Sequence, residues 1–191
     1  STAPSEGKTT AAVSLARSYA LSGKRTLLID CDMRKPSINV HLGLAPSEGL
    51  MGFLSGSESA PVAIDSILSL DPLSQVTVIA GARRSDAATD QLIAAASFAR
   101  LIRAARQAFD VVVLDTPPIG PVVDGLYIAK DVDAILFVVR YSSTSQSDAR
   151  KALANLVVSK GPQTEIVAAL NQEDISRQAY NSKYGSYYNE E

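Results

Sequence analysis

Hydrophobic residues along this chain gather in short unbroken runs, and the segments between the runs show helical spacing. A continuous apolar run of roughly four to eight residues is typical of a strand that is buried on both faces, as in a parallel sheet. We expect strands at residues 25–30, 75–80, 110–115, 134–139 and 165–170.

The intervening segments predict helices that cover such a sheet. The clearest is 86–108, which we expect to form one or two helices with an apolar stripe that includes Phe98, Leu101 and Ala105. The sequence of residues 61–70 does not distinguish between a helix and an irregular segment. The alternation of strands and helices predicts an α/β, P-loop NTPase-like fold, a mostly parallel sheet with helices on both faces in three layers. The other expected helices are 9–21, 37–42, 50–54, 123–129 and 146–158.

The first ten residues contain Gly7-Lys8-Thr9, the core of the phosphate-binding P-loop signature. In such a loop the backbone N–H groups wrap a polyphosphate, the lysine reaches the β- and γ-phosphates, and the next hydroxyl binds Mg²⁺. The full signature has a glycine where this chain has Thr2, so the motif alone is incomplete. The predicted nucleotide-binding residues are Ser5, Glu6, Gly7, Lys8, Thr9, Thr10 and Asn171.

A P-loop normally follows a strand, and no strand precedes this one in the sequence. We therefore expect the first strand of the sheet to be missing, which leaves an unfilled slot beside the loop. On this interpretation the chain is an N-terminally truncated fragment of a larger protein.

Carboxylates follow two of the predicted strands. Asp30 ends the first strand, with Asp32 two residues on, and Asp115 ends the strand 110–115. Ligands of parallel sheets bind beyond the carboxyl ends of the strands, where Asn171 also falls. Asp115 can hold Mg²⁺, and either Asp30 or Asp32 can act as a base on an acceptor hydroxyl while the other supports the metal.

The composition of the chain excludes several classes of function. The chain has 191 residues, enough for one domain, and its net charge of −2 gives no electrostatic argument for nucleic acid. No apolar run approaches the length of a membrane span. Cys31 is the single cysteine, so no disulfide can form within the chain, and the absence of G-x-G excludes a dinucleotide fingerprint. Four of the seven tyrosines lie within residues 180–188, which composition does not explain.

Three motifs together resemble those of the bacterial tyrosine kinases, the cytoplasmic catalytic domains of polysaccharide co-polymerases. Residues 2–10 resemble the Walker A motif, and Leu27-Leu-Ile-Asp-Cys-Asp-Met-Arg34 resembles Walker A′. Val112-Val-Leu-Asp-Thr-Pro-Pro118 resembles Walker B. The tyrosine-rich tail is the fourth shared feature, and its expected phosphoacceptors are Tyr180, Tyr184, Tyr187 and Tyr188.

The resemblance implies an ATP- and Mg²⁺-dependent protein-tyrosine autokinase that regulates exopolysaccharide or capsule biosynthesis and export. It implies Lys8, Asp30 and Asp32 as catalytic residues and Thr9, Asp32 and Asp115 as metal-binding residues. Residues 1–175 would form the kinase domain, and 176–191 a flexible tail phosphorylated by a neighbour in a homo-oligomeric ring. The implied partners are a membrane activator segment missing from this chain and polysaccharide assembly proteins, with no nucleic acid. The implied location is the cytoplasmic face of the bacterial inner membrane.

Some positions depart from that family and leave alternatives open. Ser5 stands where the family often has glycine, and residues 83–93 lack the family's Pro-Asn-Pro and Glu-Leu-Leu segments, with Gln91 near the glutamate position. A nucleotide-dependent interaction module with little catalysis is therefore one alternative. Another is a switch ATPase of the MinD/ParA type, although Ala3 stands where those proteins carry a second lysine.

Overall fold

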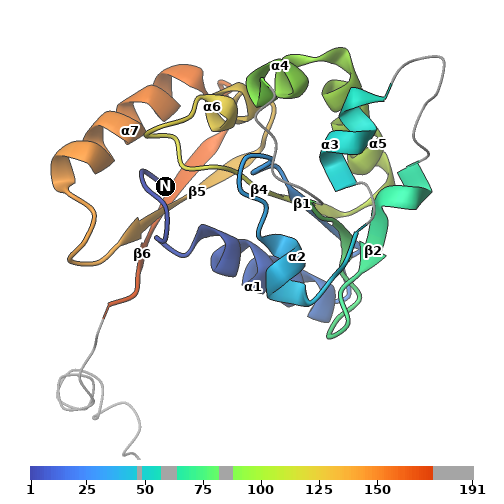
Figure 1. Cartoon of the computed structure of the whole chain (residues 1–191). Helices are drawn as coiled ribbons and strands as arrows, with labels where there is room; N and C mark the ends of the chain where they lie inside the picture. The colour runs from blue at the N-terminus through green and yellow to red at the C-terminus, as the bar shows by residue number, and fades with distance from the viewer. Residues whose placement is uncertain (47–48, 57–63, 82–87, 174–191) are drawn as a thin grey trace, which may run out of the picture.

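The apolar runs form strands in the computed structural model, which describes residues 1–46, 49–56, 64–81 and 88–173 (Figure 1). A four-stranded sheet has the order β2-β3-β1-β4. In it β1 (Thr26–Asp30) pairs in parallel with β3 (Thr77–Ile79) and with β4 (Val111–Asp115). The register sets Asp30 opposite Asp115, so two candidate site residues lie side by side at one edge.

A second sheet pairs β5 (Ala134–Arg140) in parallel with β6 (Glu165–Asn171) along their whole length. No ladder joins β4 to β5, although both strands belong to the part of the chain that the structure describes. The sheet is therefore broken beside the phosphate loop, where the sequence predicts an unfilled slot.

Helices cover both faces of the strands, as the three-layer prediction requires. Figure 1 shows α1 and α2 below the central strands and α4 and α5 above them. Within the described ranges, no helix has the length and apolar character needed to cross a bilayer. The helices are α1 (Lys8–Leu21), α2 (Ile38–Leu42), α3 (Gly49–Ser55), the 3₁₀ turn η1 (Ile64–Ile67), α4 (Thr89–Ala94), α5 (Ala96–Ala108), α6 (Asp124–Ala129) and α7 (Gln146–Ser159).

The core lies on both sides of β1 because successive side chains of a strand point to opposite faces. Leu27 and Ile29 pack in the cluster that contains Phe98 of α5, whereas Leu28 packs in the cluster that contains Val13 of α1. All five residues of β1 are buried. Full burial of a leucine or isoleucine side chain stabilises the fold by about 1.5–3 kcal/mol, which explains why Leu27, Leu28 and Ile29 at the centre of this strand are all apolar.

Segment 61–70 is the part of the chain to which the sequence assigned no definite element. Its described part forms η1 and then β2 (Leu68–Leu70), which pairs antiparallel with β3 across a tight turn. The segment 86–108 forms two helices, since Ala95 between them has extended backbone angles, φ −72° and ψ 154°.

An ion pair that is buried on its Asp71 side joins the turn between β2 and β3 to α1. Arg17 donates from Nε and Nη2 to the Asp71 carboxylate at 2.7 and 2.8 Å, and the Asp71 side chain is fully buried. The hydrogen-bonded Arg17 guanidinium lowers the pKa of Asp71 to about 2. Because this value is below that of the unfolded chain, the pair stabilises the fold above about pH 4 and the contribution is lost as the pH falls toward 2.

Asp71→Asn should therefore lower the free energy of unfolding at pH 7 by about 2 kcal/mol. Urea unfolding at pH 7, 4 and 3 measures it, and the variant should lose less stability on acidification than the unchanged chain. Asp133→Asn is the matched control, because Asp133 forms an exposed pair with Arg106 and should matter by at most about 0.5 kcal/mol. Equal losses in the two variants would contradict the assigned role.

Candidate active site

The phosphate loop has the backbone shape of an anion cradle. Gly7 precedes α1 with a left-handed φ of 89°, and no side chain caps the helix there. The first N–H groups of α1 thus point out of the helix start, where they could bind an anion. A Cβ at position 7 would collide with the Asn171 side chain, so glycine is required on two counts. Ser5 is also left-handed, with φ 63°, at a cost of about 1 kcal/mol that glycine would avoid.

Glu6 holds the loop from inside instead of facing a ligand with its carboxylate. The residue is 2% exposed, and its carboxylate accepts hydrogen bonds from the Thr2 N–H and hydroxyl and the Ala3 N–H at 2.7–3.0 Å. The Thr144 hydroxyl, which lies beyond the end of β5, also donates to it. Burial by itself would raise the pKa of Glu6, but the bonds from Thr144, Ala3 and Thr2 lower it to about 2. The loop is therefore closed by a carboxylate that stays ionised.

Asn171 lies at the loop, though against its backbone. Its side-chain amide donates to the Glu6 carbonyl at 2.9 Å, which ties the end of β6 to the loop. Its predicted contact with an adenine edge stays a prediction.

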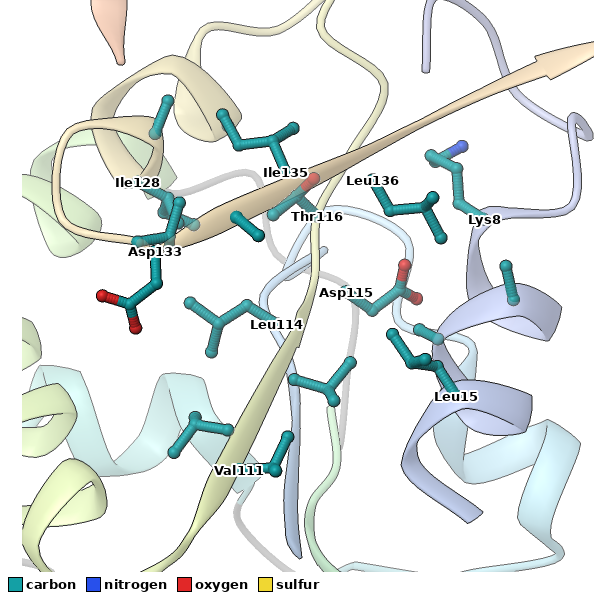
Figure 2. Close-up of a pocket in the computed structure, with 18 of the residues that line it drawn as sticks. Lys8, Leu15, Val111, Leu114, Asp115, Thr116, Ile128, Asp133, Ile135 and Leu136 are labelled. Carbon is teal, nitrogen blue, oxygen red and sulfur yellow. The ribbon is translucent and has the colours of Figure 1, made fainter. Parts of the chain in front are cut away.

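Lys8, Thr9 and Thr10 form the first turn of α1. The Lys8 ammonium lies 3.4 Å from the Ala3 carbonyl, folded over the loop, and Thr10 is exposed. The Thr9 hydroxyl donates to Asp115 at 2.6 Å and lies 3.0 Å from the Ser37 hydroxyl. In Figure 2, Asp115 sits at the end of β4 near the start of α1. The Walker A and Walker B residues that were predicted to share a metal thus meet.

Asp30 and Asp32 have different surroundings, although only one residue separates them. Asp30 is fully buried, and its two oxygens accept N–H bonds from Asp32, Ser37 and Ile38 at 3.0–3.2 Å. Asp32 is half-buried and accepts one bond, from the Lys35 N–H at 3.0 Å. Asp30 therefore shapes the segment after β1, while Asp32 presents its carboxylate at the surface of the site.

These carboxylates are buried near one another, and burial, with their mutual repulsion as a lesser cause, raises their pKa values. Burial and the charge of Asp115 raise the pKa of Asp30 to about 7. Burial raises the pKa of Asp115 to about 6, against the hydrogen bond from Thr9 and the charge of Lys8. Burial also raises the pKa of Asp32. A divalent cation would relieve this repulsion, so the donor set of hydroxyl and carboxylate oxygens fits Mg²⁺.

The described residues of the site do not form a complete set of protein ligands for a metal ion. Within the described residues, no three His, Cys, Asp or Glu side chains converge as metal ligands. Mg²⁺ in kinases and ATPases is usually held by one or two carboxylates together with the substrate phosphates and water, so Thr9 and Asp115 suffice on the protein side.

Asp124 is a further acidic residue near the site, and no motif in the sequence indicates it. Asp124 is fully buried at the start of α6, accepts a 2.5 Å bond from the Thr89 hydroxyl, and lies 3.7 Å from Arg34 of the Walker A′ segment. Its other oxygen has no hydrogen-bond partner within the described part of the chain. Sequence reasoning also missed Thr2, Ser37 and Thr144, whose contacts depend on loop conformation.

The expected acceptors Tyr180, Tyr184, Tyr187 and Tyr188 lie outside the described residues.

A phosphate loop at a helix start, faced by carboxylates at the ends of two adjacent parallel strands, defines a P-loop nucleotide-binding protein. The model of the AAA domain matches residues 5–157. The succinoglycan biosynthesis transport protein ExoP of Rhizobium meliloti is 35% identical over 97% of this chain, which spans 24% of that protein. The tyrosine-protein kinase CpsD of Streptococcus pneumoniae serotype 4 is 34% identical over 93% of this chain and 75% of its own length.

Solved structures agree with these relatives. The crystal structure of the VpsO kinase domain superposes with a TM-score of 0.77 at 27% identity, covering 88% of this chain and 81% of that one. The cell division ATPase MinD of Pyrococcus furiosus shares the fold, with a TM-score of 0.71 at 19% identity over 93% of this chain and 72% of its own. The chain belongs to the AAA domain family and, within it, to the bacterial tyrosine kinases.

Proposed function

We propose that this chain is an ATP- and Mg²⁺-dependent protein-tyrosine kinase domain that phosphorylates the tyrosines of its own C-terminal tail. One observation carries the proposal. Thr9 of the phosphate loop bonds to Asp115, which lies beside Asp30 in the sheet, and the charge of Lys8 acts on Asp32 and Asp115. The strand β6, which leads to the tail, ends at the same loop.

Each group of site residues has a separate role in phosphoryl transfer. The loop N–H groups and Lys8 bind and orient the phosphates of ATP, and Thr9 and Asp115 are the protein ligands that would hold the metal. When bound, Mg²⁺ neutralises charge on the β- and γ-phosphates. The tyrosine oxygen bonds to the γ-phosphorus as the bond from that phosphorus to the bridging oxygen breaks, and ADP leaves. The hydroxyl proton passes to a carboxylate of the Walker A′ segment.

Asp32 is the better candidate for that carboxylate. A base must come within hydrogen-bond reach of the proton that it removes, and geometry is decided before pKa. Asp32 is accessible and has one oxygen without a hydrogen bond to the described chain, whereas both oxygens of Asp30 accept buried backbone N–H bonds. Asp32→Asn should therefore slow transfer while ATP binding persists.

The tail is proposed to act between copies of the chain. In this proposal the copies form a homo-oligomeric ring at the cytoplasmic face of the bacterial inner membrane, together with a membrane activator segment and polysaccharide assembly proteins. The names of the relatives support the link to polysaccharide assembly and the kinase activity, since ExoP is a succinoglycan biosynthesis transport protein and CpsD a tyrosine-protein kinase.

A mixing experiment tests both the activity and the direction of transfer. One variant carries Lys8→Met and keeps its tail, and the other keeps Lys8 and has Tyr180, Tyr184, Tyr187 and Tyr188 replaced by phenylalanine. With Mg-ATP, mass spectrometry should find phosphate on the tail of the Lys8→Met chain only when both are present. The phenylalanine variant should bind ATP as tightly as the unchanged chain. Phosphate absent from every tyrosine of the unchanged chain would refute the kinase proposal.

The same assay separates the alternatives that the fold leaves open. MinD shares this architecture, so release of ADP without phosphotyrosine would identify a switch ATPase. ATP binding with neither product would identify an interaction module.

A further inference from the structure

The Ser37 hydroxyl does not make the contact that its place in the fold favours. Ser37 is the residue directly before α2, and a serine at that position usually accepts a hydrogen bond from an N–H of the first helical turn. Here the side chain accepts no such bond, and its oxygen lies 3.0 Å from the hydroxyl oxygen of Thr9 in the phosphate loop. A side chain that leaves its local partner for a residue of the site indicates a role in that site.

The direction of this hydrogen bond follows from the number of protons on Thr9. A threonine hydroxyl carries one proton and two lone pairs. The proton is directed at the Asp115 carboxylate, to which Thr9 donates at 2.6 Å. Thr9 has no second proton for Ser37, so Ser37 must be the donor to Thr9. The result is a chain of hydrogen bonds from Ser37 through Thr9 to Asp115, in which each bond polarises the next.

The backbone of Ser37 is held on both of its polar groups. Its N–H donates to the buried Asp30 carboxylate at 3.0 Å. Its carbonyl accepts the His41 N–H at 3.0 Å and lies 2.9 Å from His41 Nδ1. The Ser37 hydroxyl therefore reaches Thr9 from a fixed position. A binding site is precise only where such supporting contacts lock the side chains that hold the ligand.

We propose that Ser37 is a positioning residue for the metal site. Its hydroxyl holds the Thr9 hydroxyl with the proton toward Asp115 and one lone pair left for Mg²⁺. This role rests on the proposed function, in which Thr9 and Asp115 are the protein ligands of the metal. Hydrogen bonds that orient a metal ligand from outside typically change metal affinity by about 10- to 100-fold.

Replacement of Ser37 measures this contribution. Ser37→Ala removes the hydroxyl but keeps the backbone bond to Asp30, and α2 loses no side-chain cap. Calorimetric titration with ADP at several Mg²⁺ concentrations should show Mg²⁺ affinity reduced roughly tenfold, with ADP binding in chelator unchanged. Ser37→Thr keeps a hydroxyl on Cβ and should restore most of the affinity. Ser74→Ala is the matched control, because it removes a half-buried hydroxyl that bonds to Asp71, and it should leave Mg²⁺ affinity unchanged.

The Thr9 hydroxyl proton gives a second readout that needs neither metal nor nucleotide. Its exchange with solvent can be followed in the ligand-free chain through the isotope shift of the Thr9 Cβ NMR signal in mixed H₂O and D₂O. Exchange should be several-fold faster in Ser37→Ala than in the unchanged chain or in Ser37→Thr. A purely structural role of Ser37 in α2 would not change the exchange of this one proton.

Two results would overturn the proposal. One is an unchanged exchange rate of the Thr9 proton in Ser37→Ala. The other is an unchanged or higher Mg²⁺ affinity, since a higher affinity would mean that Ser37 competes with the metal for Thr9. If the unchanged chain binds ADP without any dependence on Mg²⁺, the proposed function fails, whereas proton exchange still decides whether Ser37 holds Thr9.

Discussion

Replacing Lys8 by methionine should reduce phosphotyrosine formation on the tail by roughly 100- to 1,000-fold, the range for loss of one group that stabilises charge in a transition state. The lysine is the cation that the structure folds over the phosphate loop, 3.4 Å from the Ala3 carbonyl. Methionine keeps the length of the side chain and its apolar stem but brings no charge to the γ-phosphate. Quantitative mass spectrometry of the tail after incubation with Mg-ATP measures the effect.

The fold should survive this substitution, because Lys8 is only half-buried and has no carboxylate partner among the described ion pairs. Lys151→Met on the exposed surface of α7 is the matched control and should retain full activity. A Lys8→Met chain that phosphorylates its own tail at an undiminished rate would remove the phosphate loop from the mechanism.

Asp115→Asn should weaken the binding of Mg-ATP on the order of 100-fold, while leaving the metal-free domain at least as stable as before. The carboxylate is buried beside Asp30, so it repels its neighbour whenever no cation is bound. An asparagine oxygen can still accept the Thr9 hydrogen bond but carries no charge for the metal. Calorimetric titration with ATP, with and without Mg²⁺, separates loss of metal binding from loss of nucleotide binding.

The stability of the Asp115→Asn chain gives a second, independent readout. The folded pKa of Asp115, about 6, is above that of the unfolded chain, so ionisation of this group removes stability as the pH rises from about 4 to 6. In chelator, the variant should regain up to about 3 kcal/mol at pH 8 and differ little at pH 4. A variant that is destabilised at pH 8, and binds Mg-ATP normally, would show that Asp115 is a structural residue.

Much of the fold could be predicted because a strand that is buried on both faces appears in the sequence as a continuous run of apolar residues. The central residues of β1, Leu27, Leu28 and Ile29, are buried and all apolar, and the run 25–30 shows them. β2 shows no such run, because it is a three-residue antiparallel edge strand with partly exposed side chains. It can be recognised only by its pairing with β3. Short edge strands are set by context more than by propensity.

The sequence likewise predicts some contacts of the candidate site and not others. Asp30 and Asp115 could be predicted to meet because the carboxyl ends of parallel strands share one edge of the sheet. The bond from Thr144 to Glu6 could not, because it joins residues 138 positions apart through a loop whose shape no local pattern encodes. The buried Asp124 was equally invisible, since a carboxylate after a proline-rich turn reads as an ordinary helix start.

The way the chain leaves β6 has a mechanical consequence. All seven residues of this strand are in register with β5, and the last of them, Asn171, holds the carbonyl of Glu6. A pull on the C-terminal segment acts along the strand axis, so the bonds of the ladder share the load in shear. The first point at which such tension reaches the rest of the domain is the phosphate loop. A tail held by another molecule would therefore transmit force to the phosphate loop.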